Sequence, residues 1–146
     1  MTRISEEVRS ALDAGRGVVA LETTLVDDAF RARLRALQPD VVFATEREHE
    51  VVGTLDTRWV LKRGANGLRV DGQEHPAVTT GVVDTTGAGD AFNAGLAVAL
   101  ASGKTLVEAV QYGCCAGAMA CTRLGVIPSM GRQADIDTLY RQHFGS

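Results

Sequence analysis

The sequence has few aromatic residues, no long apolar run and no large excess of charge of either sign. Phe, Trp and Tyr make up 5% of its 146 residues, so the core must consist mainly of small and aliphatic side chains. No apolar stretch approaches the ~20 residues that span a bilayer, and Glu6 and Glu7 stand where a secretory signal carries basic residues. With 15 basic and 18 acidic residues, the net charge of −3 gives no electrostatic reason to expect nucleic acid as a partner. We therefore expect a soluble, cytoplasmic protein that binds neither nucleic acid nor membrane.

Cysteine is scarce as well. Cys114, Cys115 and Cys121 lie in one apolar segment, and their odd number and close spacing argue against a disulfide framework. The paired or histidine-interleaved spacing of a zinc site is also missing. The three thiols are therefore predicted to pack in the core.

Hydrophobic residues make up 45% of the sequence, which is enough for a folded core, and the length suits one domain or a piece of a larger one. Short apolar runs alternate with helical patterns along the chain, as is typical of an α/β domain with a mostly parallel sheet. The segment at 91–101 is apolar nearly all round, which predicts a buried helix. We expect strands at 17–21, 41–44, 59–62 and 68–70 and one ending at 84, and helices at 4–14, 27–38, 46–52, 91–101, 105–121 and 134–143.

The stretch DTTGAGDAFNAG at 84–95 is the one most informative about chemistry. Backbone N–H groups at a helix start are unpaired and carry the positive end of the helix dipole, and Gly87, Ala88 and Gly89 leave them open to an anion. Asp90 adds a carboxylate beside that anion, which is useful if it takes a proton from a hydroxyl attacking a phosphate. The pattern alone also fits a Gly-rich turn whose Asp stabilises the helix start.

The longer stretch at 84–97 resembles the second signature of the PfkB, or ribokinase-like, carbohydrate kinases, and the resemblance extends from about residue 27 to residue 130. It implies part of a doubly wound ribokinase-like sheet flanked by helices. It also implies ATP-dependent phosphotransfer to a hydroxyl of a sugar or nucleoside, with Mg²⁺ neutralising the phosphates. By this resemblance Asp90 is the general base, and the backbone of residues 87–89 forms the anion hole.

The same resemblance implies further nucleotide contacts. The loop KRGANG at 62–67 looks like the family's nucleotide loop, with Lys62, Gly64 and Gly67 as contacts. Asn93, one helical turn beyond Gly89, either touches the nucleotide or packs. Cys114 occupies a position where many members carry Asn near the adenine.

The resemblance also implicates Glu48, Asp84 and Thr86 in binding cations. Asp84 and Thr86 match positions that often hold a monovalent cation such as K⁺, and the segment 122–129 resembles the loop that completes this site. Thr45 and Glu48 stand where the family commonly has Asn-x-x-Glu, which helps to place metal and phosphate. Glu48 is retained as a metal contact, whereas Thr45 keeps a hydroxyl but lacks the reach of the Asn amide.

Complete members of this family are considerably longer, and their Gly-Gly sugar-binding signature, small sheet lid and sugar-gripping acids are not found here. The resemblance therefore covers the nucleotide-binding and catalytic half, and the alternative function is that of a truncated, non-catalytic nucleotide-binding remnant or interaction module. A partial sheet leaves an edge and apolar faces uncovered, so we expect a homo-oligomer.

Residues 1–26 form a separate segment in this interpretation, followed by the kinase-like portion at 27–146. The run VVALETT at 18–24 and the helix before it look like the start of pseudouridine-5′-phosphate glycosidase, with Glu22 at a catalytic carboxylate position. Pseudouridine kinases belong to the PfkB family. Pseudouridine is therefore our leading candidate for the substrate.

Overall fold

The computed structural model describes residues 28–145. The predicted helix at 4–14, the predicted strand at 17–21 and Glu22 lie outside these residues. The described chain forms two compact units, one of residues 28–64 with 68–75 and one of residues 65–67 with 76–145. Within the described range, every helix is too short or too polar to reach across a bilayer.

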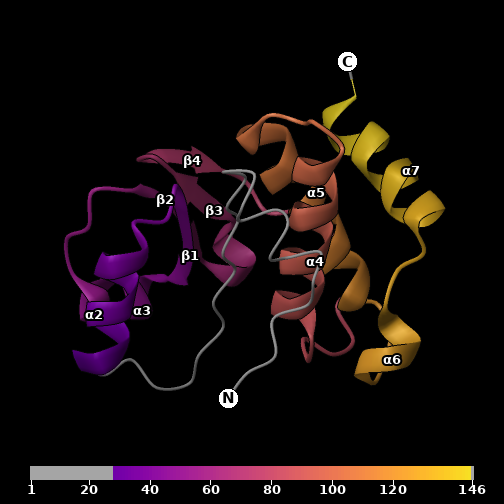
Figure 1. Ribbon diagram of the computed structural model, residues 1–146. Helices are drawn as coiled ribbons and strands as arrows, with labels where there is room; N and C mark the ends of the chain where they lie inside the picture. The colour runs from indigo at the N-terminus through magenta and orange to yellow at the C-terminus, as the bar shows by residue number, and fades with distance from the viewer. Residues whose placement is uncertain (1–27, 146) are drawn as a thin grey trace, which may run out of the picture. The chain divides into compact units, whose positions relative to one another are not determined.

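The first unit is a small α/β unit whose strands form a four-stranded sheet in the order β1-β2-β3-β4 (Figure 1). β1 and β2 are parallel, whereas β2–β3 and β3–β4 are antiparallel. The expectation of a mostly parallel sheet therefore does not hold for the described strands. A short turn connects β2 to β3 and a hairpin connects β3 to β4, and connections of this length join antiparallel strands, whereas parallel strands need a crossover. The elements are α2 (Asp28–Leu37), β1 (Val41–Thr45), α3 (Glu46–Val52), β2 (Arg58–Lys62), β3 (Leu68–Val70) and β4 (Gln73–His75).

The local sequence explains these elements. β1 and β2 bury their apolar centres, with Phe43 4% and Val60 0% exposed, and α3 packs against both strands. The hairpin between β3 and β4 turns at Asp71 and Gly72, which both have positive φ (48° and 84°), as a tight two-residue turn requires. On α2 only Leu34 is buried, and the arginines of this helix are exposed or half-buried.

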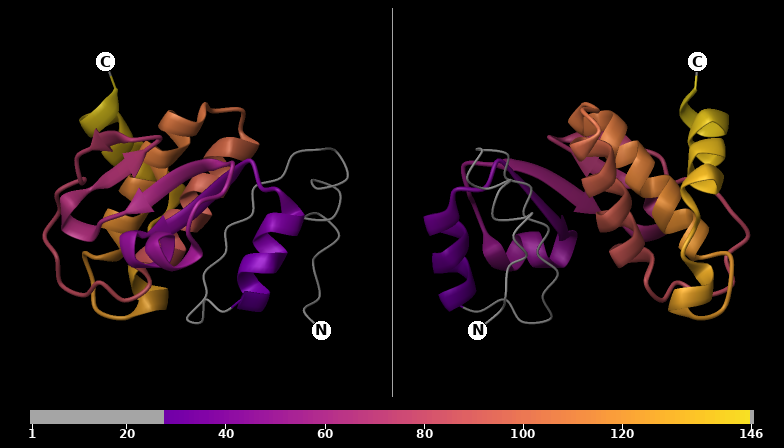
Figure 2. Two further views of the ribbon diagram at one scale, coloured as in Figure 1. Left: turned by 90° about the vertical axis from the view of Figure 1, so that its left-hand side faces the viewer. Right: turned by 45° about the vertical axis from the view of Figure 1, so that its right-hand side comes forward.

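The second unit consists of α4 (Ala88–Ala101), α5 (Leu106–Ala120), α6 (Val126–Ser129) and α7 (Gln133–Phe144), and the short 3₁₀ turn at Gly64–Asn66 lies at the junction of the units. α4 and α5 lie side by side, and α7 packs on α5 (Figure 2). Glycine lets α4 and α5 approach closely, since a Cβ on Gly95 would lie 2.7 Å from Ala116 Cβ. α5 begins with a capping box in which Thr105 and Glu108 bind each other's backbone N–H.

Three expectations for this unit need correction. The segment ending at Asp84 is not a strand: Val82 and Val83 are 66% and 64% exposed, and their stretch pairs with no strand among the described residues. α4 is not buried all round, because it packs through one face and leaves Val98 51% exposed. α6 was not expected, because its four residues are too few for a periodic pattern.

The prediction that the cysteines pack in the core is confirmed in part, since only Cys115 is fully buried. All three are free thiols, with Cys115 buried and Cys114 and Cys121 half-buried. Burial raises the pKa of Cys114 and of Cys115 to about 12. They therefore act as small apolar side chains of the α5 core.

Candidate active site

The loop that precedes α4 is held in shape by the carboxylate of Asp84. Its Oδ1 accepts hydrogen bonds from Thr86 N at 2.9 Å and Thr86 Oγ1 at 2.7 Å. Its Oδ2 accepts one from Gly125 N at 3.1 Å. These donors stabilise the ionised form and hold the pKa of Asp84 below its ordinary value.

A second connection fixes the same loop to the segment after α5. Cys121 O accepts hydrogen bonds from Val83 N at 2.8 Å and from Asp84 N at 3.2 Å. Together with the Asp84–Gly125 bond, these contacts join the predicted cation-binding residues to the segment at 121–125. The structure thus brings together Asp84, Thr86 and part of the 122–129 loop, as the resemblance implied. An ionised carboxylate beside a hydroxyl is a donor set that suits a hard cation.

The start of α4 is open, as an anion site requires. Gly87 occupies the N-cap position with φ 79°, and no side chain caps the helix. Ala88 N donates to Thr85 O, but among residues 28–145 no partner is found for the N–H groups of Gly89 and Asp90. Two backbone donors and the positive end of a 14-residue helix therefore point toward a site with no bulky side chain.

Close packing behind this helix start keeps it in place. A Cβ on Gly87 would lie 2.9 Å from Val126 Cγ1, and one on Gly117 would lie 3.0 Å from Ala88 O. α6 and α5 therefore both contact the turn that carries the open N–H groups. A larger residue at either glycine would displace those groups.

Asp90 lies in the first turn of α4, and its side chain is exposed. Its carboxylate is thus accessible to solvent beside the open N–H groups. Asn93 is half-buried one turn later, and its Oδ1 is shielded from solvent without a hydrogen-bond partner among the described residues. An unsatisfied acceptor of this kind is consistent with a contact that a ligand completes. Cys114 lies on α5 in the same unit.

The other predicted residues lie in the first unit, apart from Gly67, which belongs to the second. Thr45 is the N-cap of α3, where its Oγ1 accepts from Glu48 N at 3.2 Å and its N–H donates to Glu48 Oε2 at 2.7 Å. Both residues thus have a structural role as a capping box. Lys62 ends β2 beside Thr45, its partner across the parallel strands. Gly64 has φ 55° with open space around it, and Gly67 has φ 82° and is buried.

The structure therefore brings the predicted residues together in two sets. Thr45, Glu48, Lys62 and Gly64 belong to the first unit, whereas residues 84–93 and Cys114 belong to the second. Within residues 28–145, no three His, Cys, Asp or Glu side chains gather as a metal site.

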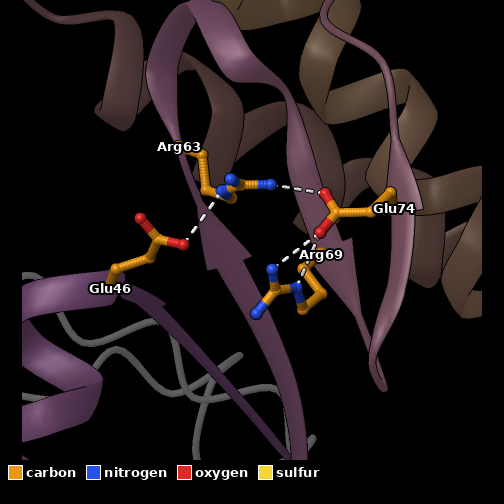
Figure 3. Close-up of polar contacts among 4 residues, drawn as sticks. All are labelled: Glu46, Arg63, Arg69 and Glu74. Carbon is orange, nitrogen blue, oxygen red and sulfur yellow. Dashed lines mark hydrogen bonds and ion pairs between the residues drawn. The ribbon is translucent and has the colours of Figure 1, made fainter.

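No sequence motif indicates the charged cluster that lies at the end of β2. Arg63 forms ion pairs with Glu46 and with Glu74, and Glu74 also pairs with Arg69 (Figure 3). The four residues come from the start of α3, the end of β2, β3 and β4. Their separation along the chain hides the cluster from any short motif; only the strand register brings them together.

Comparison with known proteins gives consistent matches. The model of the pfkB family carbohydrate kinases matches residues 44–132, more than half of the chain. The chain is 43% identical over 82 residues to probable fructokinase-7 of Arabidopsis thaliana, a match that covers 49% of this chain and 24% of the fructokinase.

Two solved structures are similar over a larger part of the chain. The nucleoside kinase of Burkholderia thailandensis in complex with inosine has a TM-score of 0.72 and 26% identity, covering 83% of this chain and 46% of that one. Arabidopsis thaliana ribokinase complexed with ribose and ATP has a TM-score of 0.63 and 25% identity, covering 73% and 43%. This chain thus matches less than half the length of each of these proteins.

Proposed function

Because the chain belongs to the pfkB family of carbohydrate kinases, we propose that it takes part in ATP-dependent transfer of a phosphoryl group to a hydroxyl of a sugar or nucleoside. The observation that carries the proposal is the open start of α4, where unpaired N–H groups of Gly89 and Asp90 adjoin an exposed carboxylate. A helix N-terminus attracts the anionic phosphoryl group, so a carboxylate beside it is best explained by a role in proton transfer.

Each residue of this turn then has one task. In the anion hole at residues 87–89, the free N–H group of Gly89, together with that of Asp90, stabilises the charge on the transferred phosphoryl oxygens, and the Asp90 carboxylate accepts the proton of the attacking hydroxyl. Asn93 contacts the nucleotide from the next turn of α4. Asp84 and Thr86 bind a monovalent cation such as K⁺, which strengthens the positive potential of the loop.

Nucleotide binding is the role we propose for the first-unit set and for Cys114. Lys62, Gly64 and Gly67 bind ATP through the end of β2 and its turn, because glycine leaves the backbone accessible to phosphates. Thr45 and Glu48 help to place the phosphates and the Mg²⁺ that neutralises them. The ATP complex of the similar ribokinase supports the choice of nucleotide.

For the phosphate acceptor we propose pseudouridine first. The support is the resemblance of residues 1–25 to pseudouridine-5′-phosphate glycosidase, together with the similarity to a nucleoside kinase that binds inosine. Ribose and fructose are the alternative acceptors, because the chain is similar to a ribokinase and to a probable fructokinase. We also propose that the chain forms a homo-oligomer, because Val82, Val83, Leu124 and Ile127 are exposed apolar residues of the second unit.

A phosphotransfer assay with Mg-ATP and each acceptor tests the proposal. The variant Asp90→Asn should lower turnover by about 10²–10⁴-fold, because it removes the base but keeps the shape of the side chain. Asp135→Asn is a matched control, since Asp135 is also an exposed acid in the third position of a helix, α7. The control should retain wild-type turnover.

Calorimetric titration of Mg-ATP and the native mass complete the test. Saturable binding with no transfer to any acceptor would favour the second candidate, a non-catalytic nucleotide-binding module. This second candidate is supported by the extent of the matches, since the chain matches less than half the length of each relative. Turnover that is equal in wild type and Asp90→Asn would contradict the assigned base, and absence of nucleotide binding by the folded chain would contradict both candidates.

A further inference from the structure

Arg63 connects three elements of the first unit. Its side chain is only 23% exposed, and its guanidinium pairs with Glu46 of α3 and with Glu74 of β4 (Figure 3). Arg63 itself follows directly after β2. One half-buried cation therefore joins the start of a helix, the exit of a central strand and the edge strand of the sheet.

These contacts lie at the edge where the two parallel strands end. Glu46 directly follows Thr45, the last residue of β1, and Thr45 is the register partner of Lys62, the last residue of β2. In α/β sheets, ligands bind outside the carboxyl ends of the strands. Arg63 thus holds together the two backbone segments that carry Thr45, Glu48, Lys62 and Gly64.

The chemistry of the cluster requires arginine. A guanidinium presents five N–H donors in a rigid plane and can serve two carboxylates on different sides, whereas an ammonium is a single point charge. Arg63 Nε lies 2.9 Å from Glu46 Oε1, which is close enough for an ion pair, but this N–H donates no hydrogen bond to any described residue. Its burial therefore depends on the charge of Glu46 as well as on Glu74.

Glu74 is shared, which ties Arg63 into a network. Arg69 donates from Nε at 2.9 Å to Glu74 Oε1, and Arg69 Nη2 lies 2.7 Å from the same oxygen. Arg69 thereby fixes the carboxylate that Arg63 uses. Two cations and two anions leave the cluster neutral, so it adds no net charge to attract phosphate.

We propose that Arg63 is a positioning residue for the nucleotide: by pairing with Glu46 and Glu74, it holds the Thr45–Glu48 segment and the Lys62–Gly64 segment in their binding arrangement. This role rests on the proposed kinase function. It acts through neighbouring backbone, and the guanidinium itself does not touch the nucleotide.

The other arginine of β2 provides a matched control. Arg58, at the opposite end of β2, pairs with Asp71 at 2.6 Å. That pair lies on the same strand and also joins it to the β3–β4 hairpin. It is distant in register from Thr45 and Lys62. Losing it removes an ion pair without disturbing the ends of the parallel strands.

The experiment compares Arg63→Met, Arg63→Lys and Arg58→Met by calorimetric titration with Mg-ATP and by hydrogen exchange of individual amides. Misplacing the two segments should raise the Kd of Arg63→Met about tenfold. Arg63→Lys should recover part of the loss, and Arg58→Met should bind as wild type does. Equal Kd values for Arg63→Met and wild type would overturn the proposal, as would equal losses in both Met variants.

Hydrogen exchange provides a readout that needs no nucleotide. The amides of Thr45 and Glu48, which are bonded in the α3 capping box, should exchange faster in Arg63→Met but not in Arg58→Met. If wild type binds no Mg-ATP, the proposed function fails, and the exchange rates alone decide whether Arg63 orders this edge. Unchanged exchange of both amides in Arg63→Met would refute the positioning role.

Discussion

Replacing Gly113 with Ala tests how α4 and α5 pack against each other. A Cβ added at Gly113 would lie 2.9 Å from Phe92 O and 3.0 Å from two carbons of the Phe92 ring. The Phe92 residue is only 5% exposed, and its carbonyl belongs to the α4 backbone. Neither neighbour can move without shifting the helix, so α4 and α5 must separate by a few tenths of an ångström.

The magnitude follows from two opposing contributions. In the middle of a helix, Ala stabilises relative to Gly by ~1 kcal/mol. Overpacking a core costs ~1–3 kcal/mol, and two close contacts with immobile groups place Gly113 in the upper part of that range. We therefore expect Gly113→Ala to lower the free energy of unfolding by ~1–2 kcal/mol and the melting temperature by ~2–8 °C.

Urea unfolding followed by circular dichroism measures this change, with Gly81→Ala as the control. A Cβ on Gly81 has no heavy atom within 4 Å and its φ is not positive, so this variant should be neutral or slightly stabilising. A rise in the urea midpoint of Gly113→Ala would show that helix propensity dominates. That result would refute the close contact between the helices.

Two titrations test the electrostatics of the second unit. Thr86 and Gly125 hold the pKa of Asp84 below its usual 3.8, so wild type should be more stable than Asp84→Asn above pH 3.8 and should lose that advantage as the pH falls through the lowered pKa. Urea unfolding at a series of pH values measures the difference in unfolding free energy between the two proteins, and a difference that stays constant on acidification would contradict the lowered pKa. Burial, followed by the hydrogen bond to Asp137, raises the pKa of Tyr112 from 10.0 to about 12, so its contribution to stability is full below pH 10.0 and is lost as the pH rises through about 12. In an ultraviolet titration, the tyrosinate absorbance that wild type gains near pH 12 should be missing from Tyr112→Phe. If the absorbance missing from Tyr112→Phe is instead one that wild type gains near pH 10.0, the raised pKa of Tyr112 and its hydrogen bond to Asp137 would be contradicted.

Several elements could be predicted from the sequence because local interactions determine them. The Asp71–Gly72 turn, the Thr105–Glu108 capping box and the short helix at 46–52 depend on residues within one or two turns of chain. The open, small-residue start of α4 also follows from its sequence, because Gly87, Ala88 and Gly89 carry no side chain larger than a methyl group that could cover the N–H groups of Gly89 and Asp90. The assignment of Asp90 as the base stays a prediction.

The incorrect expectations concern features that a second segment decides. An apolar stretch such as Val82–Asp84 becomes a strand only if another strand pairs with it, and here its two backbone bonds go to Cys121 O instead. The apolar helix α4 becomes one-sided because its neighbours cover only one face. Neither outcome is encoded in the period or the composition of the segment itself.

The sequence by itself determined the family, the turn chemistry and the residue types at the start of α4, because these depend on short-range order along the chain. Only the tertiary structure decided that Asp84 binds Gly125 and that Arg63 joins Glu46 to Glu74. The physical reason is that these partners are far apart in the chain. The partners meet only after strand pairing and helix packing have fixed where each backbone segment lies.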